Sequence, residues 1–213
     1  MKTRLIVFVA GILLMGIGIS IITKVDLGTS PISTVPYVIS YLLPGSFGFW
    51  TIMLSFVFIG LQMVLLRTVL ERTFYIQLFI SPILGIAIDI GMWLLQAYVP
   101  GLFISRILFL IVGCFILAMG IYLQIQAKLV MNAGESAVQL LSEKMNKPFS
   151  TIKIGFDWTL VATATVIGIV FLKAPVGIGV GTLISAALVG YCVKLINKWQ
   201  LINRIPVLRN ISY

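Results

Sequence analysis

The sequence repeats one pattern, RLIVFVAGILLMGIG at residues 4–18 and RILFLIVGCFILAMG at residues 106–120. In both copies an arginine and two glycines follow one another at seven-residue intervals. Later residues match in the same order, as with Gly28 and Gly134. The ordered series of matches predicts that the chain consists of two related halves.

The composition of the chain indicates a membrane protein. Hydrophobic residues make up 60% of the 213 residues, charged residues only 10%, and the mean hydropathy is +1.14. So little polar surface cannot cover a water-soluble globule. Six apolar runs approach the roughly 17–25 residues that cross a bilayer as a helix, near residues 5–22, 49–66, 74–96, 104–126, 152–172 and 174–195. The first run lacks a cleavage signal, so we expect a retained span.

The basic residues predict the orientation of these spans. The net charge is +9, with 15 Lys and Arg residues. With six spans and the N-terminus in the cytoplasm, only Lys24, Arg106 and Lys173 fall on the outer side, which leaves 12 of the 15 inside (15 − 3). Basic residues gather on the cytoplasmic side of membrane proteins, so the charge indicates a multi-pass protein of the bacterial cytoplasmic membrane with both termini inside. It does not require a nucleic-acid partner.

The predicted fold is an all-α integral membrane protein with six transmembrane helices in two inverted-topology repeats. Three spans per half is an odd number, so the second half enters from the opposite side, as in many secondary transporters. An eight-span topology splits the charges less well. The predicted parts of a single membrane domain, residues 1–213, are a first repeat at 1–100, a second repeat at 101–198 and a cytoplasmic basic tail at 199–213.

Each predicted repeat contains one short, interrupted or re-entrant helix, at residues 31–43 and 135–145. Both begin with helix-start signals, Ser30 before Pro31 in one and Asn132 with Glu135 in the other. Free N–H groups at such starts suit a polar or anionic ligand. The predicted substrate-binding residues are Gly28, Thr29, Ser30, Ser33, Thr34, Asn132, Gly134, Glu135, Ser136 and Gln139. The alternative is a pair of interfacial helices that lie flat on the membrane.

Two acidic residues, Asp89 and Asp157, fall inside predicted spans. A carboxylate there is costly unless it is paired, hydrated or neutralised, so we predict that either residue is a coupling group for a proton or cation. The alternative is a structural role, such as an ion pair between Asp157 and Lys153 four residues earlier. Gln62 and Gln77 are expected to form hydrogen bonds between helices.

The residues for most enzyme chemistry are missing from the sequence. The chain has no histidine, and its two cysteines, Cys114 and Cys192, lie inside apolar runs. No metal site, cofactor motif or catalytic acid–base pair can be assembled, so we predict no enzyme, no metal and no cofactor. The expected partners are the lipid bilayer and a small-molecule substrate, and a homo-oligomer stays open.

Three segments carry a family resemblance. LGTSPISTVP at residues 27–36, NAGESAVQLLSEK at 132–144 and PVGIGVGT at 175–182 resemble the bacterial YczE/YyaS/YitT group of integral membrane proteins. Familiar members often carry an aspartate after the Gly-x-x-Pro turn, where this chain has Ser33 and Thr34 after Ile32. The resemblance implies this topology and a transporter or accessory membrane protein.

The leading functional hypothesis is a small-molecule secondary transporter that works by alternating access, with its substrate site between the two short helices. A second hypothesis is the substrate-binding subunit of an ATP-driven importer. The Ala-x-x-x-Ala spacing that such subunits use to dock their partner is absent from residues 5–22. The same segments are also compatible with an accessory or regulatory membrane protein and with a passive channel.

Overall fold

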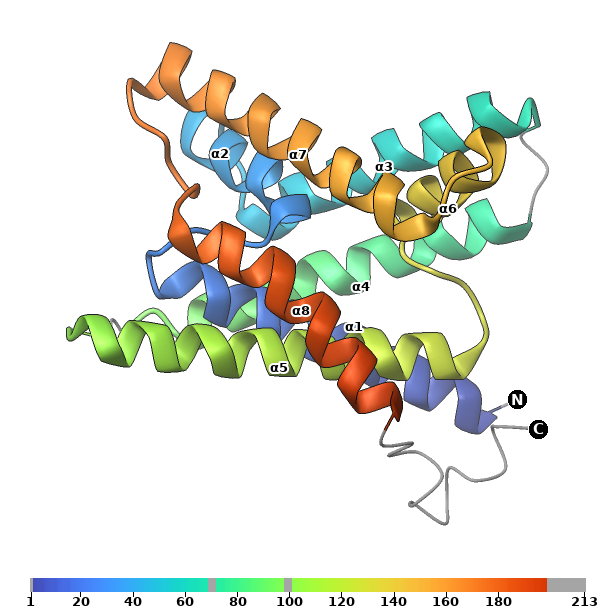
Figure 1. Cartoon of the computed structure of the whole chain (residues 1–213), viewed down its shortest axis with the longest axis horizontal. Helices are drawn as coiled ribbons and strands as arrows, with labels where there is room; N and C mark the ends of the chain where they lie inside the picture. The colour runs from blue at the N-terminus through green and yellow to red at the C-terminus, as the bar shows by residue number, and fades with distance from the viewer. Residues whose placement is uncertain (1, 69–71, 98–100, 199–213) are drawn as a thin grey trace.

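A computed structural model describes residues 2–68, 72–97 and 101–198, and within them all regular secondary structure is helical (Figure 1). The elements in chain order are α1 (Lys2–Lys24), η1 (Pro31–Ser33), α2 (Thr34–Leu42), α3 (Phe47–Leu66), α4 (Arg72–Leu94), α5 (Phe103–Ala127), α6 (Ala133–Met145), α7 (Phe149–Ile167), η2 (Gly168–Leu172) and α8 (Val180–Lys198). The basic tail predicted at 199–213 lies outside the described residues.

Five helices are long and apolar enough to cross a membrane: α1, α3, α4, α5 and the continuous α7–η2 segment. Their outer surfaces are apolar, with large side chains such as Phe79 and Phe171 exposed by 79% and 69%. Such surfaces require an apolar solvent, so the chain is an α-helical membrane protein. The apolar stretch of α8, Val180–Ile196, is shorter.

The sixth apolar run was expected to begin at residue 174, and this start is wrong. Helix α8 begins at Val180, because Pro175 and a left-handed Gly177 (φ +70°) interrupt the helix before it. The unwound stretch instead pairs with the loop after α1. The Thr29 backbone N–H donates to the Gly177 carbonyl over 2.9 Å, and that of Gly181 donates to the Leu27 carbonyl over 2.7 Å.

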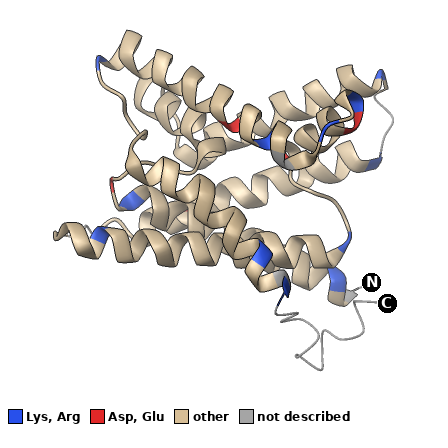
Figure 2. Cartoon of the chain, in the orientation of Figure 1, with Lys and Arg blue, Asp and Glu red and all other residues tan. Residues whose placement is uncertain are grey.

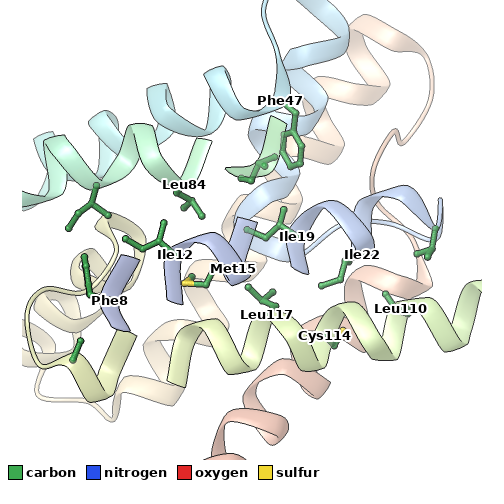
Figure 3. Packing of buried hydrophobic residues seen from close by; sticks show 14 residues of the cluster. Phe8, Ile12, Met15, Ile19, Ile22, Phe47, Leu84, Leu110, Cys114 and Leu117 are labelled. Carbon is green, nitrogen blue, oxygen red and sulfur yellow. The ribbon is translucent and has the colours of Figure 1, made fainter. Parts of the chain in front are cut away.

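The buried core lies along α1. Ile12, Met15, Ile19 and Ile22 recur at the spacing of one helix face and are at most 3% exposed. Figure 3 shows these side chains among those of α5, such as Leu117, and those of α3 and α4. Burial on this scale makes α1 the central helix of the bundle.

Helices α1 and α5 pack antiparallel, with glycines at their contact. A Cβ atom on Gly18 would lie 2.6 Å from the backbone nitrogen of Leu117, and one on Gly120 would lie 2.6 Å from the carbonyl oxygen of Gly11. No other residue fits such a close approach of two backbones without a shift. The glycines of the repeated pattern therefore set the distance between the two helices.

The two short helices each turn back before crossing the molecule. In Figure 1, the chain runs from the end of α1 toward the middle of the molecule, and η1 and α2 then run back toward the side on which α1 ends. Helix α6 runs back in the same way toward the side on which α5 ends. The 9 residues of α2 and the 13 of α6 extend only about 14 Å and 20 Å. Helix was expected over residues 31–43 and 135–145. The observed segments are Pro31–Leu42, whose first turn is a 3₁₀-helix, and Ala133–Met145.

Candidate functional site

The two short segments meet at their helix starts. A Cβ atom on Gly134, in the first turn of α6, would collide with the side chain of Ile32 in η1 and would lie 3.4 Å from the ring of Phe58. Glycine at residue 134 therefore allows η1, α3 and α6 to come together. The sequence predicted that these starts would share one site, and the structure brings them into contact.

The polar residues of the first segment are buried and bond to one another. The hydroxyls of Thr23 and Thr29 are 2.7 Å apart, and the Ser30 hydroxyl donates to that of Ser33 over 2.9 Å. The Thr34 hydroxyl donates to a backbone carbonyl in the preceding turn. Ser30 occupies the predicted cap position, yet its side chain makes no capping bond. These hydroxyls stabilise the turn.

Asn132, at the start of α6, also differs from its predicted capping role. It occupies the cap position without a side-chain capping bond. Its side-chain oxygen accepts a hydrogen bond from Gln124 over 3.0 Å, and its amide lies 3.4 Å from the sulfur of Met15. Asn132 thus ties the start of α6 to α5 and α1.

A pair of buried glutamines fixes α6 to α3 and α4. Gln62 and Gln77 bond to each other through both side-chain amides, which confirms their expected interhelical role. Gln62 also donates to the Ala133 carbonyl over 3.1 Å, and Gln77 donates to the Ser136 hydroxyl over 2.9 Å. Neither glutamine was among the predicted substrate-binding residues.

A cavity of about 160 Å³ lies beside these glutamines, between α3, α4 and α6. Its lining residues are Gln62, Leu66, Thr73, Phe74, Met131, Ser136, Gln139 and Leu140. Two predicted binding residues, Ser136 and Gln139, therefore line this cavity, whereas the hydroxyls of the first segment are not among its lining residues. The cavity is half open to its surroundings, and its volume is close to the roughly 150 Å³ of an enclosed cavity that binds benzene.

The next face of α6 carries a charged cluster that consists of Glu135, Lys153 and Asp157. The Lys153 ammonium donates to the Asp157 carboxylate over 2.6 Å, and these side chains are 26% and 16% exposed. Both groups act electrostatically on Glu135. Figure 2 shows charged residues of α7 next to α6, away from the charges at the helix ends. The ion pair left open by the sequence is present, and a second carboxyl joins it.

Burial raises the pKa of the Glu135 carboxyl, and the nearby Lys153 ammonium opposes that shift. Its Oε2 atom is fully enclosed and has no hydrogen-bond partner among the described residues. An enclosed carboxylate oxygen without a partner is costly, whereas a protonated carboxyl is not charged. The cluster is therefore a place where a proton can be held.

Asp89, the other predicted coupling residue, is on α4, and its carboxylate contacts the start of α3. Its carboxylate accepts hydrogen bonds from the Gly48 backbone N–H over 2.8 Å and from the Ser46 hydroxyl. The Ser46 hydroxyl in turn accepts from the Phe49 backbone N–H over 3.0 Å. Among the described residues, Asp89 and Ser46 therefore form a cap at the start of α3. No group of three or more His, Cys, Asp or Glu residues among the described residues could hold a metal ion.

Comparisons with known proteins place these features in a family. A protein-family model described as "Family of unknown function (DUF6198)" matches residues 2–198. The chain is 25% identical over 182 residues to "Uncharacterized protein YyaS" of Bacillus subtilis (strain 168), and the match covers 84% of this chain and 85% of that protein. No solved structure matches the chain. The similarity to YyaS confirms that part of the resemblance.

Proposed function

Because the chain belongs to the family of unknown function DUF6198, its activity has to be argued from its own residues, and we propose that it is a small-molecule secondary transporter. The observation that carries this proposal is the cavity beside the start of α6, lined by Gln62, Ser136 and Gln139. A short helix that starts inside a membrane protein, next to a mainly apolar cavity with a few polar groups in its wall, is typical of transporter substrate sites.

The proposed architecture is a pair of inverted repeats, and the contact between α1 and α5 supports it. A Cβ atom on Gly11 would lie 3.1 Å from the backbone nitrogen of Gln124, and one on Gly113 would lie 3.1 Å from that of Ile22. A shift of 102 residues (113 − 11 = 124 − 22) converts one pair into the other. Two antiparallel helices related in this way fit a two-fold axis in the membrane plane.

The contacts between the other helices also correspond when each helix is replaced by its counterpart in the other half. Helix α1 packs against α4 and α5 against α8, while α3 packs against α6 and α7 against α2. In this proposal α8 is the sixth span, since its 19 residues extend about 28 Å, close to the roughly 30 Å of hydrocarbon.

One pair of helices departs from this symmetry. Helices α3 and α4 pack closely, while α7 and α8 are separated in Figure 1 by the unwound residues 173–179. In alternating access the repeats move relative to one another around a fixed site, and two halves in different conformations fit such motion.

The cavity also indicates the kind of substrate. Its polar groups are the amides of Gln62 and Gln139 and the hydroxyls of Thr73 and Ser136, and Phe74 is among its apolar residues. Neutral donors and acceptors in a cavity of about 160 Å³ suit a small uncharged solute that can form hydrogen bonds.

The proposed location is the bacterial cytoplasmic membrane with both termini inside. Figure 2 shows Lys and Arg more often at the molecular end where α1 begins than at the opposite end, as the orientation rule requires for a cytoplasmic side. The cavity is lined by Leu66, the last residue of α3, and by Thr73, in the first turn of α4. It therefore lies toward the proposed cytoplasmic side.

A transport assay tests this proposal. Solutes that differ between cells with and without the protein would be identified by untargeted metabolite analysis. Exchange of each labelled candidate would then be measured in vesicles that contain the full-length protein. We expect saturable exchange, and we expect Ser136→Ala to raise the half-saturation concentration by roughly two- to tenfold, as for one lost hydrogen bond.

Thr163→Val is the matched control, because the Thr163 hydroxyl donates to a carbonyl of its own helix on an exposed face. It should leave the half-saturation concentration unchanged. Flux that rises linearly with concentration would identify a channel instead. Uptake that requires a copurifying ATPase would identify an importer subunit, and no flux of any candidate would leave an accessory role.

A further inference from the structure

The charged cluster of Glu135, Lys153 and Asp157 contains one more acid than base. With all three groups ionised its net charge is −1 (+1 − 2), and a single added proton makes it neutral. A net charge away from water is costly for a membrane protein, so such residues mark proton relays and ion paths in transporters. The charge balance therefore favours one bound proton.

The geometry distinguishes the two carboxyl groups. Asp157 holds the Lys153 ammonium at 2.6 Å on the same helix. Glu135 reaches the cluster from α6, and its Oε2 atom is enclosed without a hydrogen-bond partner among the described residues. A carboxylate with an ammonium partner stays ionised more readily than one with an unpaired oxygen. Glu135 is thus the group in which a proton removes the larger penalty.

The cluster is also connected to the proposed substrate site through α6. Glu135 faces the charges of α7, while Ser136 lines the cavity and accepts a hydrogen bond from Gln77. Successive residues on an α-helix are about 100° apart, so one helical turn presents one side chain to each site. A movement of the start of α6 changes both sites together.

We propose that Glu135 is the proton-carrying residue of this transporter. It binds and releases the proton next to the ion pair of Lys153 and Asp157. This proposal rests on the proposed function. The proton comes from water on one side of the membrane, binds the Glu135 carboxylate, and leaves to water on the other side after the rearrangement. One proton then accompanies each movement of substrate, and no covalent step is involved.

The other charged groups around α6 are few. The helix packs mainly against α3 and α7. Helix α3 carries no charged residue from Phe47 to Leu66, and α7 contributes Lys153 and Asp157. On α6 itself, Glu143 and Lys144 lie in the last turns, where the Glu143 carboxylate accepts from Gln139 over 2.7 Å. The pH response of Glu135 is therefore set chiefly by Lys153 and Asp157.

Infrared spectroscopy tests proton binding without any substrate. The full-length protein in lipid vesicles would be titrated with acid and base while the C=O stretching band of protonated carboxyl groups is recorded. We expect Glu135→Gln to remove a band that the wild type shows at neutral pH, and the exposed-carboxylate variant Asp26→Asn to retain it. Retention of the band in Glu135→Gln would overturn the proposal.

A second variant keeps this test decisive if Glu135→Gln does not fold. Because the Lys153 ammonium lowers the pKa of Glu135, Lys153→Gln should move the midpoint of the band to higher pH. An unchanged midpoint would overturn the proposal as well.

Transport measurements separate this inference from the proposed function. For the solute that the wild type exchanges, Glu135→Gln should retain exchange without a gradient and lose accumulation driven by a pH gradient. Gradient-driven accumulation equal to that of the wild type would overturn the role of Glu135 and leave the transporter proposal intact. If the wild type exchanges no solute, the proposed function and its proton coupling both fail, although the infrared titration still decides whether Glu135 holds a proton.

Discussion

Single residues in this protein show how the same side chain serves two different needs. Asp89 and Asp157 are both acids inside helices, yet Asp89 accepts hydrogen bonds at the start of α3 and Asp157 pairs with Lys153. The sequence places both in apolar segments and cannot distinguish them, because the Ser46–Gly48 turn that meets Asp89 is 41 to 43 residues away along the chain.

Asp89→Ala should destabilise the protein rather than uncouple it. The substitution leaves the Gly48 N–H and the Ser46 hydroxyl without the carboxylate that accepts from them. We expect the free energy of unfolding in detergent micelles to fall by about 1–3 kcal/mol. Glu143→Ala, which removes an exposed carboxylate, is the control. Unchanged stability with lost gradient-driven uptake would instead support the coupling role predicted for Asp89.

The hydroxyls of the first short segment show why a binding site is difficult to predict from residue type. Thr29, Ser30, Ser33 and Thr34 are the polar residues that a ligand site requires. In the structure they bond to neighbouring hydroxyls and carbonyls, because short side chains reach backbone groups three or four residues away. Sequence alone gives no indication of which hydroxyls remain available for a ligand.

At the scale of helices, long apolar runs were predictable and their ends were not. The five candidate spans lie close to the expected positions, since hydropathy over some 20 residues outweighs local detail. The sixth run failed at its start because Pro175 and Gly177 barely change the hydropathy but interrupt the helix. Gln62 and Gln77 could be predicted to bond across helices, but that Gln62 and Ser136 line one cavity could not.

The glycine contact of α1 and α5 yields a paired prediction. Gly18→Ala and Gly120→Ala should each lower the free energy of unfolding by about 1–3 kcal/mol, because the added methyl meets backbone atoms 2.6 Å away. Gly60→Ala is the control, since its methyl would meet nothing within 4 Å. Unfolding in micelles measures all three. Equal losses of stability in Gly18→Ala and Gly120→Ala would fit two equivalent helices. A loss in Gly60→Ala as large as that in Gly18→Ala would contradict the close contact between α1 and α5.

The whole molecule has a topology that two exposed residues can test. With six spans, Leu102 lies outside the cell and Leu129 inside; if both short helices crossed, the two locations would be exchanged. In a chain with Cys114 and Cys192 replaced by alanine, Leu102→Cys should react with a membrane-impermeant maleimide in intact cells, and Leu129→Cys only after lysis. Both side chains are exposed, by 76% and 42%.

The reverse labelling pattern would establish eight spans. Lys147→Cys is the internal control, because both topologies place residue 147 in the cytoplasm and its side chain is exposed. It should therefore react only after lysis in either case.

The packing of α1 against α5 also constrains how the protein is made. Helix α1 ends at residue 24 and α5 begins at residue 103, so 78 residues (103 − 24 − 1) lie between them. At roughly 5–20 residues per second the ribosome needs about 4–16 s to synthesise that interval. During this time the glycine face of α1 has no partner and must be held by lipid or by the insertion machinery. The nascent chain is therefore most vulnerable to degradation before its second half is synthesised.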